Sequence, residues 1–147
     1  MKTVHEILLK KGNAIWSISP DATVFDALKL MAEKKVGALL VIKVEILVGI
    51  MSERDYARKV ILQGKFSKDT LVSEIMSSKV LYVNSKLSTE ECMALMINKR
   101  VRHLPVIDND KLIGIISIGD IVNAVIDEKE FVIDQLVHYI VGTPKLM

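Results

Sequence analysis

Apolar and polar residues follow one another along this chain in patterns typical of short strands and amphipathic helices, and the whole arrangement occurs twice. Residues 49–55 (GIMSERD) return 65 positions later as residues 114–120 (GIISIGD). The same offset, without a gap, aligns Leu39 with Leu104 and Leu47 with Leu112. Two copies are too few for a solenoid. The repeat therefore predicts two similar subdomains related by a pseudo-twofold axis, with functional residues in the crevice between them.

The first repeat is predicted to contain a strand, a helix, two strands and a second helix. Pro20, Asp21 and Thr23 are residues that favour a helix start. Val44 tolerates turn dihedral angles badly, so the turn at residues 43–45 is expected to be irregular or mobile. The predicted elements are a strand at 14–18, a helix with Val24, Leu28, Met31 and Ala32 on one face, strands at 36–42 and 46–51, and a helix at 53–63 closed by Gly64.

The second repeat is expected to follow the same order, with a conventional polar turn at residues 108–111. A short apolar segment at 71–76 separates the repeats. The predicted elements are a strand at 80–83, a helix at about 88–98, strands at 104–107 and 112–117, a helix that starts near Gly119, and a final helix at 127–141 stopped by Gly142 and Pro144.

Composition narrows the class of protein. The net charge of +2 is too small to indicate nucleic-acid binding. No apolar stretch approaches the about 18 residues of a membrane span, and the N-terminus lacks the features of a secretory signal. A single cysteine, Cys92, rules out an intramolecular disulfide, and its apolar helical context predicts a buried small hydrophobe. The chain is expected to be soluble and cytoplasmic, with no membrane or nucleic-acid partner.

The Ser-x-x-Asp that ends each predicted hairpin carries the candidate chemistry. One interpretation is purely structural: Ser52 and Asp55 form a capping box at a helix N-terminus. The other is a ligand site, because helix N-termini favour phosphate and Arg54 and Arg58 could hold phosphate oxygens. A carboxylate such as Asp55 can also accept hydrogen bonds from both hydroxyls of a ribose. The glycine before each motif is a position where a ligand or another backbone can come close.

Two further absences bear on the class of site. No group of His, Cys, Asp and Glu has the spacing of metal ligands, so no metal is expected. No nucleophile lies in a known catalytic context, so the chain is expected not to be an enzyme.

Taken together, these motifs resemble those of a tandem pair of cystathionine-β-synthase (CBS) domains, also called a Bateman module. The family pattern Gly-apolar-x-Ser/Thr-x-x-Asp matches Gly49, Ser52 and Asp55, and its repeat at 114–120. Residues 52–58 (SERDYAR) and 102–106 (RHLPV) resemble segments of small stand-alone bacterial pairs, which act in signalling. The resemblance covers roughly residues 3–127.

The resemblance implies an α/β (α+β) fold of two βαββα subdomains packed sheet to sheet, with added N- and C-terminal helical segments. The expected domains are a first CBS motif with the N-terminal segment at 1–68, a second motif at 69–127, and a C-terminal helix and tail at 128–147. It also implies binding of a regulatory ligand, namely AMP, ADP, ATP or NAD, with S-adenosylmethionine ranked behind these.

By the same resemblance, Asp55 and Asp120 would hold ribose hydroxyls, with Ser52 and Ser117 near the phosphate. Arg54 and Arg58 would support the phosphate of the first site, and Arg102 and His103 would reach toward it from the other repeat. This makes the Ser52/Asp55 site the expected tighter one. The residues expected to flank the adenine are Ile18, Ser19, Val83 and the backbone around Ala38, Leu39, His103 and Leu104.

Two of these residues keep a structural alternative. His103 could instead be a core histidine with its hydrogen bonds satisfied. Trp16 could stack on a base, but packing in the core is the favoured interpretation.

The predicted function is a nucleotide sensor that signals its ligand state to an unknown effector protein. The alternatives are a ligand-independent structural or dimerisation module and, behind it, an enzyme that processes nucleotides or NAD. Apolar stripes on the helices at 53–63 and 119–127 predict a homodimer. They consist of Tyr56, Ala57, Val60 and Ile61 in the first repeat and of Ile121, Val122, Val125 and Ile126 in the second.

Overall fold

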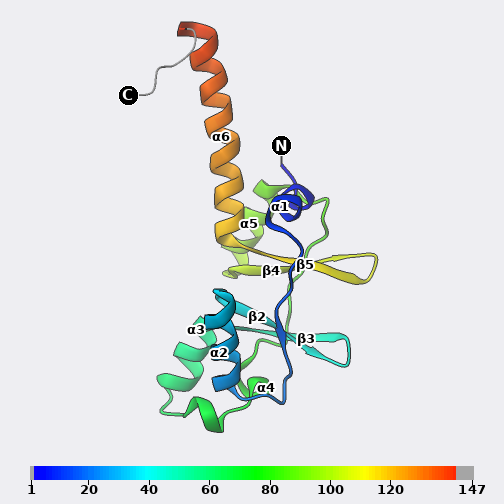
Figure 1. The fold of residues 1–147 in the computed structure, drawn as a ribbon, viewed down its shortest axis with the longest axis vertical. Helices are drawn as coiled ribbons and strands as arrows, with labels where there is room; N and C mark the ends of the chain where they lie inside the picture. The colour runs from blue at the N-terminus through cyan, green and yellow to red at the C-terminus, as the bar shows by residue number, and fades with distance from the viewer. Residues whose placement is uncertain (1, 142–147) are drawn as a thin grey trace. The chain divides into compact units, whose positions relative to one another are not determined.

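The computed structural model describes the backbone of residues 2–141 and the side chains of residues 2–138. Its chain forms two compact units, one made of residues 14–81 and the other of residues 2–13 together with residues 82–141. Each unit combines a small β-sheet with helices (Figure 1). The predicted mixed α/β class and the internal repeat are therefore confirmed. None of the helices in residues 2–141 has the length and apolar content needed to cross a bilayer.

The unit at 14–81 has the predicted order of strand, helix, two strands and helix. Its sheet has the order β1-β2-β3, with β1 parallel to β2 and β2 antiparallel to β3. Thr23 caps the first helix by accepting a hydrogen bond from Asp26 N at 3.1 Å. The elements are β1 (Ser17–Ile18), α2 (Val24–Lys34), β2 (Ala38–Lys43), β3 (Ile46–Ser52), α3 (Glu53–Tyr56), the π-helix η1 (Ala57–Ile61), the 3₁₀-helix η2 (Ser67–Asp69) and α4 (Val72–Ile75).

The helix predicted at 53–63 differs from the observed one. Only its first turn is α-helical, and the next turn widens into η1, with Leu62 N donating to Ala57 O at 3.2 Å. A π-turn holds one more residue than an α-turn, and such turns are frequent at functional sites. Gly64 ends the segment with a φ of 70°, as predicted.

The other unit repeats this order with one strand missing. Its two-stranded sheet pairs β4 with β5 in antiparallel orientation. The strand predicted at 80–83 is wrong, because only Val83 pairs with Val106, in a single parallel bridge. Directly after it, Ser85 N donates to Asp108 Oδ1 and Lys86 N to Asn84 Oδ1, so side chains take the place of further strand partners. The elements are α1 (Val4–Lys11), α5 (Thr89–Lys99), β4 (His103–Asp108), β5 (Lys111–Ser117) and α6 (Ile118–Val141).

Helix α6 is continuous where two helices were predicted, one near Gly119 and one at 127–141 (Figure 1). No glycine or proline occurs between residues 120 and 141, so nothing in the backbone interrupts the helical hydrogen bonds. The predicted stop at Gly142 and Pro144 lies outside the described residues.

The segments at residues 2–8 and 70–76, called lead segments below, occupy corresponding places in the two units, although they come from different parts of the chain. In one unit, Val4 N donates to Leu87 O and Thr89 N to Lys2 O. In the other, Val72 N donates to Ala22 O and Val24 N to Thr70 O. Residues 2–8 therefore play in one unit the part that residues 70–76 play in the other. The predicted domains at 1–68, 69–127 and 128–147 remain a proposal.

The hairpin turn at 43–45 is regular, and the expectation of an irregular turn is wrong. Lys43 pairs directly with Ile46, which leaves Val44 and Glu45 as a two-residue loop with φ values of 47° and 67°. Asn109 and Asp110 have nearly the same values, 50° and 63°. Two positive φ angles define the type I′ turn, whose twist matches that of the flanking strands. The sheet thus imposes this geometry even on valine.

Candidate functional site

The first motif forms the capping box that the sequence predicts. Ser52 is the last residue of β3, and its Oγ accepts a hydrogen bond from Asp55 N at 3.2 Å. In return, Asp55 Oδ2 accepts from Ser52 N at 2.9 Å and from Ser52 Oγ at 3.1 Å. This reciprocal pattern satisfies two backbone donors of the helix start. One oxygen of Asp55 is therefore occupied by the cap.

The second oxygen of Asp55 has a partner that the sequence interpretation missed. Lys59 Nζ lies 3.2 Å from Asp55 Oδ1 and donates a second hydrogen bond to Ile75 O at 2.8 Å. The side chain of Asp55 is 15% exposed and that of Lys59 is 46% exposed. The i,i+4 spacing of an acid and a lysine on one helix is a signal that could have identified this pair.

Basic residues surround a cavity beside this motif. The cavity has a volume of about 310 Å³, and both Arg58 and Lys59 reach it. Arg54 is half-buried and Arg58 is exposed. The lining residues are Arg58, Lys59, Gln63, Lys65, Glu74 and Ile75. The basic residues of this region thus come from α3, η1 and the segment that follows.

The second motif repeats the cap. Asp120 Oδ2 accepts from Ser117 N at 2.8 Å, and Ser117 Oγ accepts from Asp120 N at 3.1 Å. The same carboxylate oxygen receives Lys11 Nζ at 2.7 Å, and Lys11 also donates to Ile115 O at 2.7 Å. Lys11 belongs to α1 and lies 109 residues away from Asp120 in the sequence, so no local pattern indicated this contact.

The charges around Asp120 shift two ionisation equilibria. Burial alone would raise the pKa of Asp120, but the hydrogen bonds from Lys11 and Ser117 outweigh it and hold the pKa below its ordinary value. His103, whose backbone pairs with that of Ser117, has a lowered pKa because burial disfavours its charged form and Lys11 repels it. The second motif therefore holds an ionised carboxylate beside a histidine that favours its neutral form.

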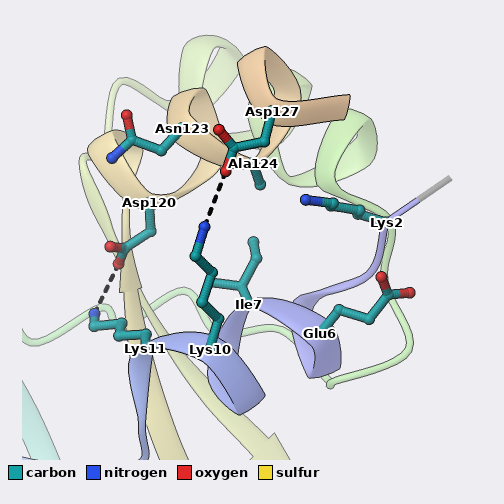
Figure 2. Close-up of a pocket in the computed structure, with 9 residues that line it drawn as sticks. All are labelled: Lys2, Glu6, Ile7, Lys10, Lys11, Asp120, Asn123, Ala124 and Asp127. Carbon is teal, nitrogen blue, oxygen red and sulfur yellow. Dashed lines mark hydrogen bonds and ion pairs between the residues drawn. The ribbon is translucent and has the colours of Figure 1, made fainter. Parts of the chain in front are cut away.

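A cavity of about 440 Å³ lies between α1 and α6 and reaches Asp120 (Figure 2). Figure 2 shows two ion pairs across it, Lys11 with Asp120 and Lys10 with Asp127, the second at 3.0 Å. The lining residues are Lys2, Glu6, Ile7, Lys10, Lys11, Asp120, Asn123, Ala124 and Asp127.

The residues expected to flank an adenine divide between the two units. In one unit, Ala38 pairs with Ser52, Ile18 pairs with Val41, and Ser19 is exposed just after β1. In the other, Arg102 O accepts a hydrogen bond from Ile118 N, which brings Arg102 and His103 to the start of α6. The contribution of Arg102 and His103 to the Ser52/Asp55 site remains a prediction.

Four of these residues are buried. Leu39 and Leu104 are fully buried and Val83 nearly so, and Ala38 is buried to about the same degree as Val83. Leu39 packs with Met51 in the core of its unit. Only the backbone of Leu39 and Leu104 is therefore suited to contact a ligand.

Two predictions about single residues can be judged directly. Trp16 is 38% exposed, with Lys34 Nζ 4.4 Å from the ring centroid, so the favoured interpretation of core packing is wrong. Cys92 is fully buried, as predicted, and burial together with the charge of Glu91 raises the pKa of its thiol to about 11. In the part of the chain that the structure describes, no cluster of His, Cys, Asp and Glu is suited to a metal ion.

Comparison with known proteins extends this picture. The CBS domain family matches the chain twice, at residues 5–61 and 72–127. The mitochondrial CBS domain-containing protein CBSX3 of Arabidopsis thaliana is 40% identical over 95% of this chain and 72% of its own length. The CBS domain-containing protein YhcV of Bacillus subtilis is 35% identical over 71% of this chain and 74% of its own.

Solved structures agree with the sequence comparison. A protein with CBS domains from Burkholderia ambifaria is 53% identical and has a TM-score of 0.84, over 87% of this chain and 96% of that one. A structure of CBSX2 in complex with AMP is 32% identical and has a TM-score of 0.69, over 88% of this chain and 99% of that one. A hexameric CBS-CP12 protein from bloom-forming cyanobacteria is 29% identical, with a TM-score of 0.75 over 95% and 87%.

Proposed function

The chain belongs to the CBS-domain family as a tandem pair of CBS domains, and on that premise we propose that it is a regulatory module that binds an adenosine nucleotide. The ligand class is AMP, ADP, ATP or NAD. S-adenosylmethionine ranks behind these because its sulfonium is positive, and Arg54, Arg58 and Lys59 already place positive charge around Asp55. The AMP bound by the related CBSX2 supports this class.

One observation carries the proposal: each unit presents a partly exposed carboxylate at the mouth of a helix, in an ion pair with a lysine. Asp55 pairs with Lys59 and Asp120 pairs with Lys11. A carboxylate can exchange a lysine for the two hydroxyls of a ribose, and the released lysine can then bind a phosphate. The positive end of the helix dipole at each motif favours the same phosphate.

In this proposal the motif residues have separate roles. Asp55 and Asp120 accept the ribose hydroxyls, and Ser52 and Ser117 lie near the phosphate. The cations beside each motif neutralise the phosphate charge. The residues proposed to line the adenine are Ile18, Ser19, Ala38, Leu39, Val83, His103 and Leu104, and Arg102 is proposed to contribute a further cation.

The alternative is a ligand-independent structural module. The capping boxes favour it, because helix capping alone accounts for every hydrogen bond between Ser52 and Asp55. In that case the motif stabilises the fold and binds no ligand.

Thermal unfolding with and without ligand separates the two functions, because a ligand that binds only the native state must raise its stability. We expect at least one of AMP, ADP, ATP and NAD to raise the melting temperature of the wild-type protein. Asp55→Asn together with Asp120→Asn should abolish this rise, since an amide has a single neutral acceptor oxygen, which the cap already uses. Absence of any shift with all of these ligands would establish the structural alternative.

The controls for this experiment come from the same helix. Glu53→Gln removes a charge from the exposed residue two positions before Asp55 and should leave the ligand-induced shift intact. Removal of capping interactions costs about 1 kcal/mol of stability. The melting temperature of each variant without ligand is therefore the reference for its own shift.

We also propose that the module forms a homodimer through the helical regions at 53–63 and 119–127 and passes its ligand state to an unidentified effector protein. Exposed apolar side chains in both regions support this, since such stripes mark interfaces. They are Ile61, Leu62, Val122 and Ile126. A cytoplasmic location belongs to the same proposal.

A further inference from the structure

The packing of α1 holds the backbone of Lys11 in place. Val4, Ile7 and Leu8 of α1 are buried, and α1 packs on β5 and α6. Gly12 follows with a φ of 97° and donates its N–H to Leu8 O at 2.8 Å, which ends the helix directly after Lys11. The ammonium group therefore reaches the start of α6 from a fixed backbone position.

The ammonium group and the motif carboxylate partly shield each other from water. The side chain of Lys11 is 34% exposed and that of Asp120 is 23% exposed. Two hydrogen bonds of 2.7 Å, to Asp120 Oδ2 and to Ile115 O, fix the position of Nζ. Charge-assisted hydrogen bonds of this length are among the stronger ones in proteins.

A ribose whose two hydroxyls bind the two oxygens of Asp120 must take over the acceptor position on Oδ2 that Lys11 now uses. Ser117 N also donates to Oδ2, so this oxygen already accepts two hydrogen bonds. Displacement of Lys11 leaves a partly buried ammonium without its anion, which costs free energy. A phosphate on the ligand would supply a new anion for Lys11, whereas an uncharged nucleoside would not.

From this geometry we infer that Lys11 determines ligand specificity at the Ser117/Asp120 site. Its ion pair with Asp120 disfavours the binding of uncharged nucleosides, whereas a ligand that carries a phosphate can bind Asp120 because the phosphate becomes the new partner of Lys11. The inference rests on the proposed function and names a residue outside both repeats of the motif. It assigns to the N-terminal helix a direct part in ligand selection.

The first motif lacks this arrangement. Its lysine, Lys59, lies on the same helical segment as Asp55, bonds to the oxygen that the cap does not use, and is 46% exposed. Water can replace its partner at lower cost, because exposed ion pairs contribute little. The selection is therefore a property of the second site, and it gives a physical reason for the expected inequality of the two sites.

The test measures the affinities of AMP and adenosine by calorimetry in an Asp55→Asn background, which leaves the second site as the binding site under study. We expect this parent protein to bind AMP and to discriminate against adenosine. Addition of Lys11→Met should tighten adenosine binding and reduce the ratio of the two affinities by roughly tenfold, the size of one charge-assisted hydrogen bond.

Lys10→Met in the same background is the matched control. Lys10 neighbours Lys11 in α1 and makes an ion pair of its own with Asp127, in a more exposed position. Its loss should leave the affinity ratio unchanged. Circular dichroism and the melting temperature establish that each variant is folded.

An unchanged ratio in folded Lys11→Met protein would overturn the inference. So would an Asp55→Asn protein that binds neither compound while the wild-type protein binds AMP, because the second site would then take no nucleotide. Failure of the proposed function has a different signature, namely a wild-type protein that binds no adenosine compound.

Discussion

Leu8 lies directly over Gly114, so closely that a Cβ atom at position 114 would be 2.8 Å from Leu8 Cδ2. The corresponding glycine of the other unit, Gly49, is covered by Met76 and Ser77, with a Cβ atom 2.7 Å from Met76 Sδ and 3.0 Å from Ser77 O. In the structure, the space beside each glycine is taken by the lead segment of its unit. The glycines of the two motifs thus serve the packing of the chain itself.

Alanine at the two glycines should destabilise the protein to different extents. At Gly114 the close contact is the end of a leucine side chain, which can move, so Gly114→Ala should cost about 1 kcal/mol of unfolding free energy. At Gly49 the contact includes the carbonyl of Ser77, whose peptide groups bond to Ile50 at 3.0 and 2.9 Å, so Gly49→Ala should cost about 2 kcal/mol. Urea unfolding measures both, and a larger loss at Gly114 would contradict the packing argument.

The turn at Val44 and Glu45 holds residues of the wrong type for its geometry. A non-glycine residue in the left-handed region costs on the order of 1 kcal/mol, most for a β-branched residue such as Val44. Val44→Asn with Glu45→Gly should therefore raise the unfolding free energy by about 1 kcal/mol. Asn109→Val in the other hairpin is the matched reverse change and should lower it. Equal melting temperatures for all three proteins would show that neither turn is strained.

Stability should decrease as the pH falls from neutral, in two steps with different origins. The pKa of His103 in the folded protein lies below its ordinary 6.5, so its contribution is complete above that value and is lost as the pH falls toward the folded pKa. The pKa of Asp120 is also lowered, so its contribution is present above 3.8 and is lost as the pH falls through the folded pKa.

Urea unfolding at a series of pH values checks this order. His103→Asn should flatten the dependence just below pH 6.5, and Lys11→Met should reduce the acid step because Asp120 loses its cation. His138→Asn, at an exposed position of α6, controls for the loss of an imidazole. A wild-type protein that gains stability as the pH falls from 7 to the acid step would contradict the sign of the His103 shift, and one that gains stability through the acid step would contradict the sign of the Asp120 shift.

Cys92 should be unreactive in the folded protein. Its thiol is fully buried and its pKa is raised to about 11, and only the thiolate reacts with disulfide reagents. A chromogenic disulfide reagent at mildly alkaline pH should therefore label the protein only after addition of urea. Rapid labelling without urea would indicate that α5 opens readily.

A charged substitution in the proposed homodimer interface should convert the dimer to a monomer. Ile126 is 46% exposed, so Ile126→Lys should weaken association without disturbing the core, and light scattering should then give the mass of one chain. Phe131→Ser, at an exposed apolar position of α6 outside the proposed interface, is the control and should leave the dimer intact. A monomeric wild-type protein would contradict the proposal.

Features whose causes lie within a few residues of one another could be predicted from the amino-acid sequence. The repeat and the βαββα order of the first unit were predictable from the spacing of apolar residues. The caps at Thr23 and Ser88 and both Ser-x-x-Asp boxes were predictable because each of their hydrogen bonds joins residues three positions apart. The carboxylates of the candidate sites belong to this group. Local chemistry of this kind needs no knowledge of the rest of the chain.

Contacts between distant segments were established only by the tertiary structure. It paired Lys11 with Asp120, packed residues 2–8 and 70–76 into corresponding places, and reduced the strand predicted at 80–83 to one bridge. It also imposed on Val44 a conformation that valine alone would avoid. Each of these outcomes depends on burial and on sheet twist, which are properties of the packed chain and not of any short stretch of it.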